Sequence, residues 1–108
     1  MKNEAYIVAA KRSAVGKANK GSLRSVRPDD LAASVIRSLM GELPQLDKNS
    51  VDDVLVGNAM PEAEQGLNMG RLVSLLGLEV VDVPGATVNR YCASGLETIA
   101  MATAKIRS

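Results

Sequence analysis

The 108-residue chain contains no phenylalanine, tryptophan or histidine, and it has one cysteine and two tyrosines. So few aromatic rings disfavour a stacking platform for single-stranded nucleic acid. The absence of histidine removes the most common zinc ligand and the most common general base. A single cysteine cannot form an internal disulfide. The sequence therefore predicts an aliphatic core, no metal site and a cytoplasmic location.

Long apolar runs are also missing. The first apolar stretch, AYIVAA at residues 5–10, is followed at once by Lys11 and Arg12. It is far shorter than the roughly 20 residues of a membrane helix and too short for a signal peptide. A chain of this length buries enough surface for one modest core. We therefore expect one domain, or part of one, over residues 1–108, with no membrane span.

Positive charge is concentrated at the start of the chain, although the net charge is only +1. Residues 1–28 hold seven Lys or Arg against one acid, whereas residues 29–108 hold six against eleven. A phosphate-bearing ligand and a solvated surface loop both fit such a segment, and the loop is the simpler interpretation. Nucleic acid is a weaker alternative because the overall charge is close to zero. The basic residues of this segment are Lys11, Arg12, Lys17, Lys20, Arg24 and Arg27.

Segments with strand and helix periodicity alternate along the chain. The resulting β-α-β-α-β-α order predicts an α/β fold with a parallel sheet. The alanines of the last helix suit close packing between layers, so this C-terminal helix is predicted to be buried. A sheet of three strands keeps unpaired edges, so the chain is expected to be the start of a larger domain. Strands are predicted at residues 4–10, 52–58 and 86–89, and helices at about 28–43, 65–77 and 92–106.

Cys92 lies where the last predicted strand ends and the last predicted helix begins, within VNRYCASGLE at residues 88–97. A sulfur at this position lies near the first N–H groups of the helix, whose partial positive charge favours a thiolate. The same N–H groups can donate to an oxyanion, and Ser94 and Gly95 keep the turn small. A buried, unreactive cysteine is an equally good interpretation of the spacing alone. The chain also has no histidine to act as the base.

The segment VNRYCASGLE resembles the sequence around the nucleophile of the thiolases. Three further segments resemble the same family in the same order, so the resemblance covers essentially the whole chain. It implies the first half of a thiolase-type fold, with residues 1–108 as an incomplete N-terminal part of the thiolase N-terminal domain. The segments are KRSAVGK at 11–17, GSLRSVRPDDL at 21–31 and DDVLVGNAMPEAEQGLNMGRLVSLLGL at 52–78, the last continuing into VPGATVNRYC at 83–92.

The resemblance implies an acyltransferase that cleaves 3-ketoacyl-CoA with coenzyme A, as in fatty-acid β-oxidation, or runs the reverse Claisen condensation. Cys92 would be its catalytic nucleophile and would hold the acyl group as a thioester. Acyl-CoA and coenzyme A would be substrates, no resident cofactor is implied, and the full enzyme would be a homo-oligomer, dimeric or tetrameric. The alternatives are an acetoacetyl-CoA-forming acetyl-CoA acetyltransferase and a non-catalytic scaffold. The stretch AMPEAEQGLN at 59–68 favours the degradative branch.

Some residues depart from the family pattern. Ser13 and Ala14 stand where many thiolases have Thr-Pro, and Tyr91 stands where Gln is common, which leaves the substrate subclass open. The activating histidine and second cysteine of thiolases have no counterpart in this chain, so we expect residues 1–108 alone to be inactive. Structural or subunit-contact roles are expected for Arg71, Asn89 and Arg90.

Overall fold

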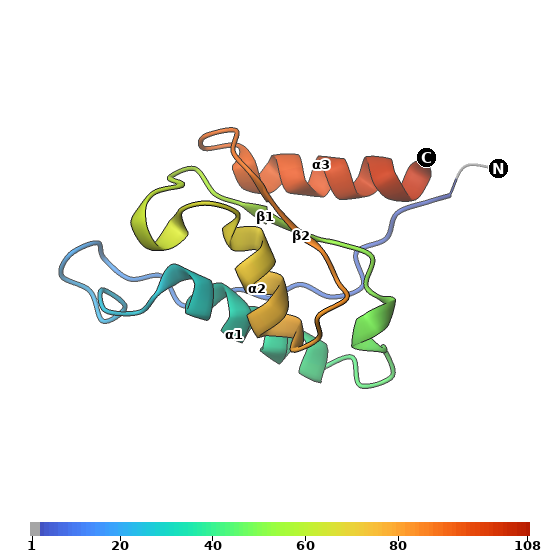
Figure 1. Cartoon of the computed structure of the whole chain (residues 1–108), viewed down its shortest axis with the longest axis horizontal. Helices are drawn as coiled ribbons and strands as arrows, with labels where there is room; N and C mark the ends of the chain where they lie inside the picture. Colours follow the sequence, from blue (N-terminus) through green and yellow to red (C-terminus); the bar gives the residue numbers. More distant parts are fainter. Residues whose placement is uncertain (1–2) are drawn as a thin grey trace.

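The computed structural model describes residues 3–108 (Figure 1). Within this range the chain forms three α-helices and two strands, joined by loops that contain two short 3-10 helices. Their order is α1 (Pro28–Gly41), η1 (Lys48–Ser50), β1 (Val54–Gly57), η2 (Ala63–Gln65), α2 (Met69–Leu78), β2 (Gly85–Val88) and α3 (Ser94–Arg107).

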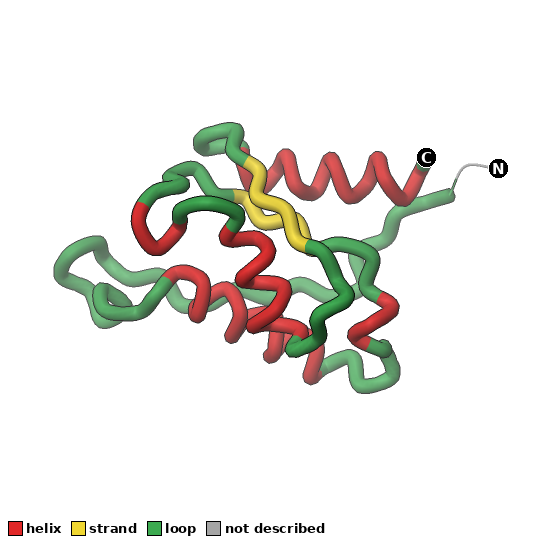
Figure 2. The backbone as a smooth tube through the Cα atoms, viewed as in Figure 1, coloured by secondary structure: helices red, strands yellow, loops and turns green. Residues whose placement is uncertain are grey.

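The two strands form a parallel ladder in which Val54 pairs with Gly85 and Gly57 with Val88. Helix α2 packs on both strands and on α1, whereas α3 packs mainly on β1 (Figures 1 and 2). The chain thus has three layers, with α1 and α2 on one side of the sheet and α3 on the other. The predicted α/β class with a parallel sheet is confirmed.

The start of α1 follows from its sequence. Pro28 supplies the backbone angle of the first turn, and Asp29 and Asp30 suit the positive end of the helix dipole. The buried core lies where α1 meets α2 and the strands, and it is aliphatic, as the lack of aromatic residues predicts. One cluster of it consists of Met40, Leu78 and Val83, with Ile36, Leu39, Val51, Val54 and Val80 packed against them, and Ala33, Met69 and Val73 are also buried.

Helix α2 approaches β2 at backbone contact distance. A Cβ atom built on Gly85 would lie 2.2 Å from the carbonyl oxygen of Gly70, so neither position has room for a side chain. Gly70 N–H also donates to the Thr87 hydroxyl at 2.9 Å. This contact fixes the direction in which β2 leads toward residues 89–93.

The first predicted strand, residues 4–10, is not a strand in the structure. No sheet pairing involves this segment within residues 3–108, and Tyr6, Ile7 and Val8 are 74, 83 and 79 % exposed. Directly after the segment, Lys11 Nζ contacts Ser38 Oγ of α1 at 3.0 Å and Oε1 of Glu42, the residue that follows α1, at 2.8 Å. Apolar β-compatible residues predict extended backbone, but a strand also needs a neighbouring edge, and β1 and β2 pair only with each other.

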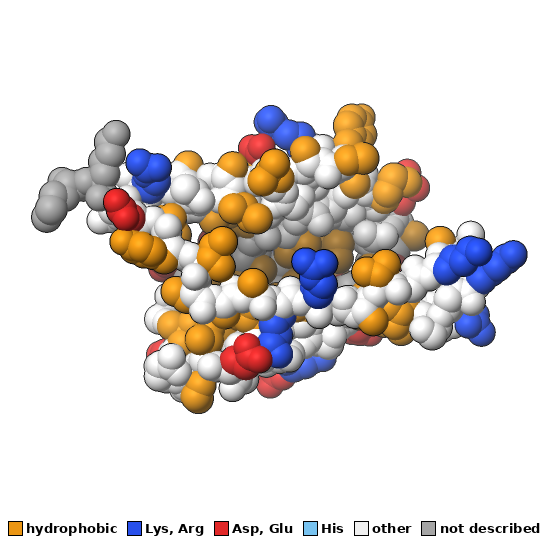
Figure 3. Space-filling model, turned by 180° about the vertical axis from the view of Figure 1, so that it is seen from behind, with side chains coloured by type: hydrophobic (Ala, Val, Ile, Leu, Met, Phe, Trp, Pro, Cys, Tyr) orange, Lys and Arg blue, Asp and Glu red, His pale blue; other side chains and the backbone are white. Residues whose placement is uncertain are grey.

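The prediction that the last helix is buried is also wrong. Leu96, Ile99 and Ile106 of α3 are 71, 57 and 47 % exposed, and Ser94 is its one buried residue. Small residues allow close packing on several sides, but among the helices and strands of the described residues α3 packs mainly on β1, with weaker contact to β2. Seen from behind, the molecule has apolar side chains around a hollow (Figure 3).

Candidate functional site

Cys92 lies in the turn between the end of β2 and the start of α3, and it is exposed. The helix begins two residues after the sulfur-bearing residue, at Ser94, rather than at Cys92 itself. The turn is anchored to the sheet because β1 abuts α3. A Cβ atom on Gly57 would lie 2.7 Å from the carbonyl carbon of Ser94 and 2.8 Å from the nitrogen of Gly95.

Tyr91, directly before Cys92, has a left-handed backbone with φ of 46°. This conformation is unfavourable for a residue other than glycine and persists where its surroundings hold it. The Tyr91 N–H donates to Asn89 Oδ1 at 3.0 Å. Its carbonyl accepts from the Ser94 N–H at 3.1 Å and from the Ser94 hydroxyl at 2.7 Å. The turn that presents Cys92 is therefore held on both sides of Tyr91.

Ser94 is 4 % exposed, and its hydroxyl has two partners in the turn. The hydroxyl donates to the Tyr91 carbonyl and accepts a hydrogen bond from the Arg90 N–H at 2.8 Å. The sequence predicts only that Ser94 is small. Its hydrogen-bonding role had a local signal, because serine at a helix start commonly bonds to nearby backbone, but spacing cannot show that the bonds span the cysteine.

The amide groups around Cys92 fall into two sets. Ala93 N–H donates to the Arg90 carbonyl at 3.0 Å, and Ser94 N–H donates to Tyr91 as above. Within residues 3–108, the N–H groups of Cys92, Gly95 and Leu96 have no protein acceptor. Free backbone donors at a helix start can bind developing negative charge. An exposed thiol that is a neighbour in the chain of such donors is suited to attack on a carbonyl group.

Arg90 and Arg71, for which structural or subunit-contact roles are expected, both make contacts within the protein. Arg90 Nε lies 3.4 Å from Glu97 Oε2, which joins the turn to α3. Arg71 donates from Nη1 to the Val83 carbonyl at 2.7 Å and from Nη2 to the Val81 carbonyl at 2.9 Å. These bonds hold the loop that leads into β2, in line with the role expected for Arg71.

The basic N-terminal segment is largely exposed, and several of its cations have partners within the protein. Arg27 forms a two-bond ion pair with Asp29, each bond 3.1 Å long, and contacts Glu64 at 3.5 Å. The Arg27 hydrogen bonds, together with the Asp30 N–H, hold the pKa of the buried Asp29 carboxyl below its ordinary value. Arg24 donates to the Gly21 carbonyl at 3.0 Å. These contacts account for Arg24 and Arg27 without a phosphate ligand.

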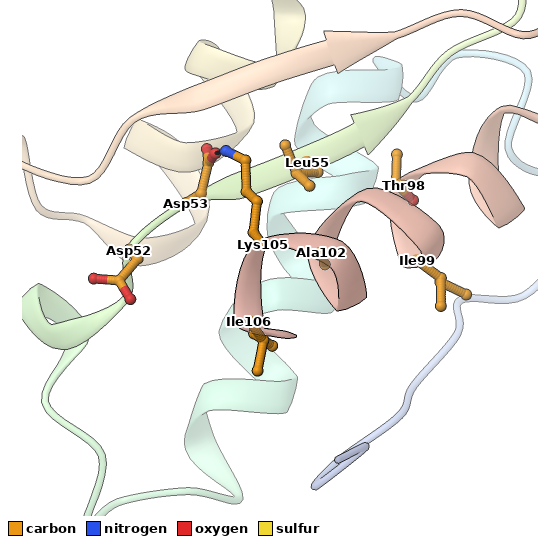
Figure 4. Close-up of a pocket in the computed structure, with 8 residues that line it drawn as sticks. All are labelled: Asp52, Asp53, Leu55, Thr98, Ile99, Ala102, Lys105 and Ile106. Carbon is orange, nitrogen blue, oxygen red and sulfur yellow. Dashed lines mark hydrogen bonds and ion pairs between the residues drawn. The ribbon is translucent and has the colours of Figure 1, made fainter. Parts of the chain in front are cut away.

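A groove of about 480 Å³ lies between β1 and α3, and it does not include Cys92 (Figure 4). Leu55 lines it from the strand, and Thr98 and Ala102 line it from the helix. The ion pair of Asp53 and Lys105 lies at one end. The groove runs along the later turns of α3, whereas Cys92 precedes the first turn, so the two features are separate.

Residues 3–108 contain no cluster of three or more acidic, cysteine or histidine side chains that would hold a metal ion. None of the helices in this range has the length and apolar composition required to cross a membrane.

Comparison with known proteins finds the same family along nearly the whole chain. The family model for the N-terminal domain of thiolase matches residues 5–108. The 3-ketoacyl-CoA thiolase of Bacillus subtilis (strain 168) is 50 % identical over 103 residues, which are 95 % of this chain and 26 % of that protein. The beta-ketoadipyl-CoA thiolase of Pseudomonas knackmussii is 40 % identical over 108 residues, which are 100 % of this chain and 27 % of that protein.

A solved structure agrees with these relatives. The crystal structure of the Bacillus anthracis acetyl-CoA acetyltransferase superposes with a TM-score of 0.87 at 28 % identity, covering 98 % of this chain and 26 % of that one. The predicted thiolase-type fold is thereby confirmed. The chain spans about a quarter of the length of the curated relatives that it matches.

Proposed function

Because the chain belongs to the thiolase family, we propose that Cys92 is the nucleophile of an acyl-CoA acyltransferase. The observation that carries this proposal is the exposed thiol in a held turn, next to backbone N–H groups at the start of α3. A buried cysteine, the alternative left open by the spacing, would not be accessible to a substrate carbonyl.

The proposed reaction is the cleavage of a 3-ketoacyl-CoA. The sulfur of Cys92 attacks the 3-keto carbon, and free N–H groups of the turn donate to the oxyanion that forms. The bond between carbons 2 and 3 then breaks, acetyl-CoA leaves as its enolate and takes up a proton, and the acyl group stays on sulfur as a thioester. The thiol of coenzyme A attacks this thioester, releases acyl-CoA and returns the cysteine. The Claisen condensation is the same sequence reversed.

Two proton transfers in this scheme need groups that the chain does not contain. The Cys92 proton must be taken up and the enolate must be protonated, but there is no histidine and no second cysteine in the 108 residues. We infer that these groups come from outside residues 1–108, and that the chain alone completes no catalytic cycle.

The names of the relatives support a 3-ketoacyl-CoA substrate. The relative that is 50 % identical to this chain is called a 3-ketoacyl-CoA thiolase. This name favours the degradative reaction, as in fatty-acid β-oxidation. An acetoacetyl-CoA-forming reaction is the second candidate, favoured by the structural similarity to an acetyl-CoA acetyltransferase. In either case coenzyme A and its acyl ester are substrates and no resident cofactor is required. We further propose a cytoplasmic location, since a lone free thiol suits a reducing compartment. We also propose that the full enzyme is a homo-oligomer.

The test is acyl transfer to a single sulfur. The chain is incubated with acetyl-CoA and weighed by mass spectrometry, with Cys92→Ala as the control. Buffer can take up the Cys92 proton in place of the missing base, so the proposal expects one acetyl group on the wild-type protein, on Cys92, and none on the variant. Cys92→Ala is also placed in a longer protein that carries these residues and cleaves 3-ketoacyl-CoA. Turnover that survives the substitution would overturn the assignment.

A further inference from the structure

Ser94 holds the turn that carries Cys92, and we propose that it is a positioning residue for acyl transfer at that sulfur. The inference rests on the proposed function, because it concerns the same thiol. The supporting observation is that Ser94 connects the chain on both sides of Cys92. A hydroxyl that is almost fully buried bonds the backbone on the amino side of Cys92, while the main chain of the same residue begins α3 on the carboxyl side.

The hydroxyl matters because the backbone that it holds is strained. Tyr91 keeps a φ of 46°, which is unfavourable for a tyrosine. Such conformations persist where several contacts determine them together. Asn89 fixes the N–H of Tyr91, and Ser94 fixes its carbonyl through both the N–H and the hydroxyl. The Arg90 N–H is held by the same hydroxyl oxygen.

Loss of the hydroxyl removes two of these bonds and leaves the Arg90 N–H without its partner. Tyr91 is then free to return to a negative φ, and Cys92, the next residue along, moves relative to the N–H groups at the start of α3. A carbonyl attacked by the displaced sulfur places its oxyanion away from those donors. Acyl transfer depends on such donors, whereas alkylation by iodoacetamide forms no oxyanion. The two reactions therefore report different properties of the same thiol.

Thr98 provides a matched control. Its hydroxyl donates to the Gly95 carbonyl at 2.7 Å, three residues back, as the Ser94 hydroxyl donates to Tyr91. The Thr98 bond lies one turn further into α3 and holds no part of the cysteine turn. Removing it therefore tests the general effect of a lost helix hydroxyl.

The experiment uses the whole chain, in which every thiol reaction reports Cys92 because it is the sole cysteine. Acylation by p-nitrophenyl acetate and alkylation by iodoacetamide are timed by mass spectrometry, with Cys92→Ala giving the background. Ser94→Ala is expected to lower the ratio of acylation rate to alkylation rate by at least about tenfold, because misplaced oxyanion donors cost rate at this scale or above. Ser94→Thr, which keeps the hydroxyl, is expected to give a ratio within about twofold of the wild-type value. Thr98→Ala is expected to leave the ratio unchanged.

Two further measurements keep the test decisive. Asn89→Ala removes the other anchor of Tyr91 from an exposed position, so it lowers the ratio even if Ser94→Ala fails to fold. Hydrogen exchange at the Arg90 amide is faster in Ser94→Ala than in wild type and unchanged in Thr98→Ala. A ratio within twofold of wild type in folded Ser94→Ala, or unchanged Arg90 exchange, overturns the positioning role. Buffer can take up the Cys92 proton in place of the missing base, so a wild-type chain that takes up no acyl group from p-nitrophenyl acetate counts against the proposed function. Unchanged Arg90 exchange in Ser94→Ala overturns the role of Ser94 in either case.

Discussion

Gly57, the last residue of β1, lies so close to Ser94, the first residue of α3, that a Cβ atom on the glycine would be 2.7 Å from the serine carbonyl carbon. The sheet therefore touches the backbone of the turn that carries Cys92 with no side chain between them. This contact, together with the hydrogen bonds of Ser94, connects the position of the thiol to the position of the strands.

Gly57→Ala is expected to destabilise the chain, because the new methyl group meets backbone atoms that cannot move aside independently. A loss of about 1–3 kcal/mol in the free energy of unfolding is expected, typical of overpacking. Gly41→Ala is the control, since a Cβ there has no atom within 4 Å, and it is expected to be neutral or stabilising by up to about 1 kcal/mol in a helix. Urea unfolding followed by circular dichroism measures both. Equal effects of the two substitutions would contradict the close contact.

Tyr91 is expected to tolerate glycine better than a β-branched residue. Tyr91→Gly relieves a left-handed strain of about 1 kcal/mol or more, which offsets the greater flexibility of glycine in the unfolded chain. Tyr91→Ile adds branching at the same positive φ and is expected to cost about 1–2 kcal/mol. Thermal melts of the three proteins measure the order. An isoleucine variant as stable as the glycine variant would show that Tyr91 is not held at positive φ.

Asp29 makes the stability depend on acid pH. Its pKa is lowered below the ordinary value of 3.8, chiefly by the hydrogen bonds from Arg27. A carboxyl with a lowered folded-state pKa stabilises the fold above its unfolded pKa, and this contribution is lost as pH falls through the folded value. We therefore expect the stability advantage of wild type over Asp29→Asn to be constant near neutral pH and to shrink below about pH 4.

Urea unfolding of the wild type and Asp29→Asn across pH 2–7 measures this difference. Asp53→Asn serves as the comparison, because Asp53 pairs with Lys105 on the other side of the sheet and is more exposed. A difference between wild type and Asp29→Asn that stays constant down to pH 2 would rule out the Arg27 effect.

The open face of α3 predicts self-association. Leu96 and Ile99 are 71 and 57 % exposed, and Ile99 also lines the groove between α3 and β1. Contiguous apolar surface of this kind drives association. Sedimentation velocity is expected to show oligomers that weaken in Ile99→Lys but persist in Leu67→Lys, a control at a 98 % exposed position in the loop before α2. A monomeric wild type with a cooperative melt would refute the prediction.

Most of the fold was predictable because its signals are local. Each signal comes from residues that lie close together in the sequence. This holds for the apolar stripe of α1, the run of valine and leucine in β1 and the helix after Cys92. The predicted start of the second helix near residue 65 was early, since a short 3-10 helix at Ala63–Gln65 precedes α2. Periodicity cannot separate a 3-10 helix from the α-helix that follows it, because both kinds of helix place apolar residues on one side.

The order of elements around Cys92 and the family that this order indicates could be inferred without a structure, because motifs and periodicity are properties of neighbouring residues. Three features were found in the folded chain and could not be inferred from residue order: residues 4–10 form no sheet pairing, the apolar side chains of α3 are partly exposed, and the cysteine turn contains a left-handed tyrosine held by a buried serine. Strand pairing and burial depend on contacts between distant segments, and a strained φ depends on the hydrogen bonds that offset it, so neither is encoded in the spacing of residue types.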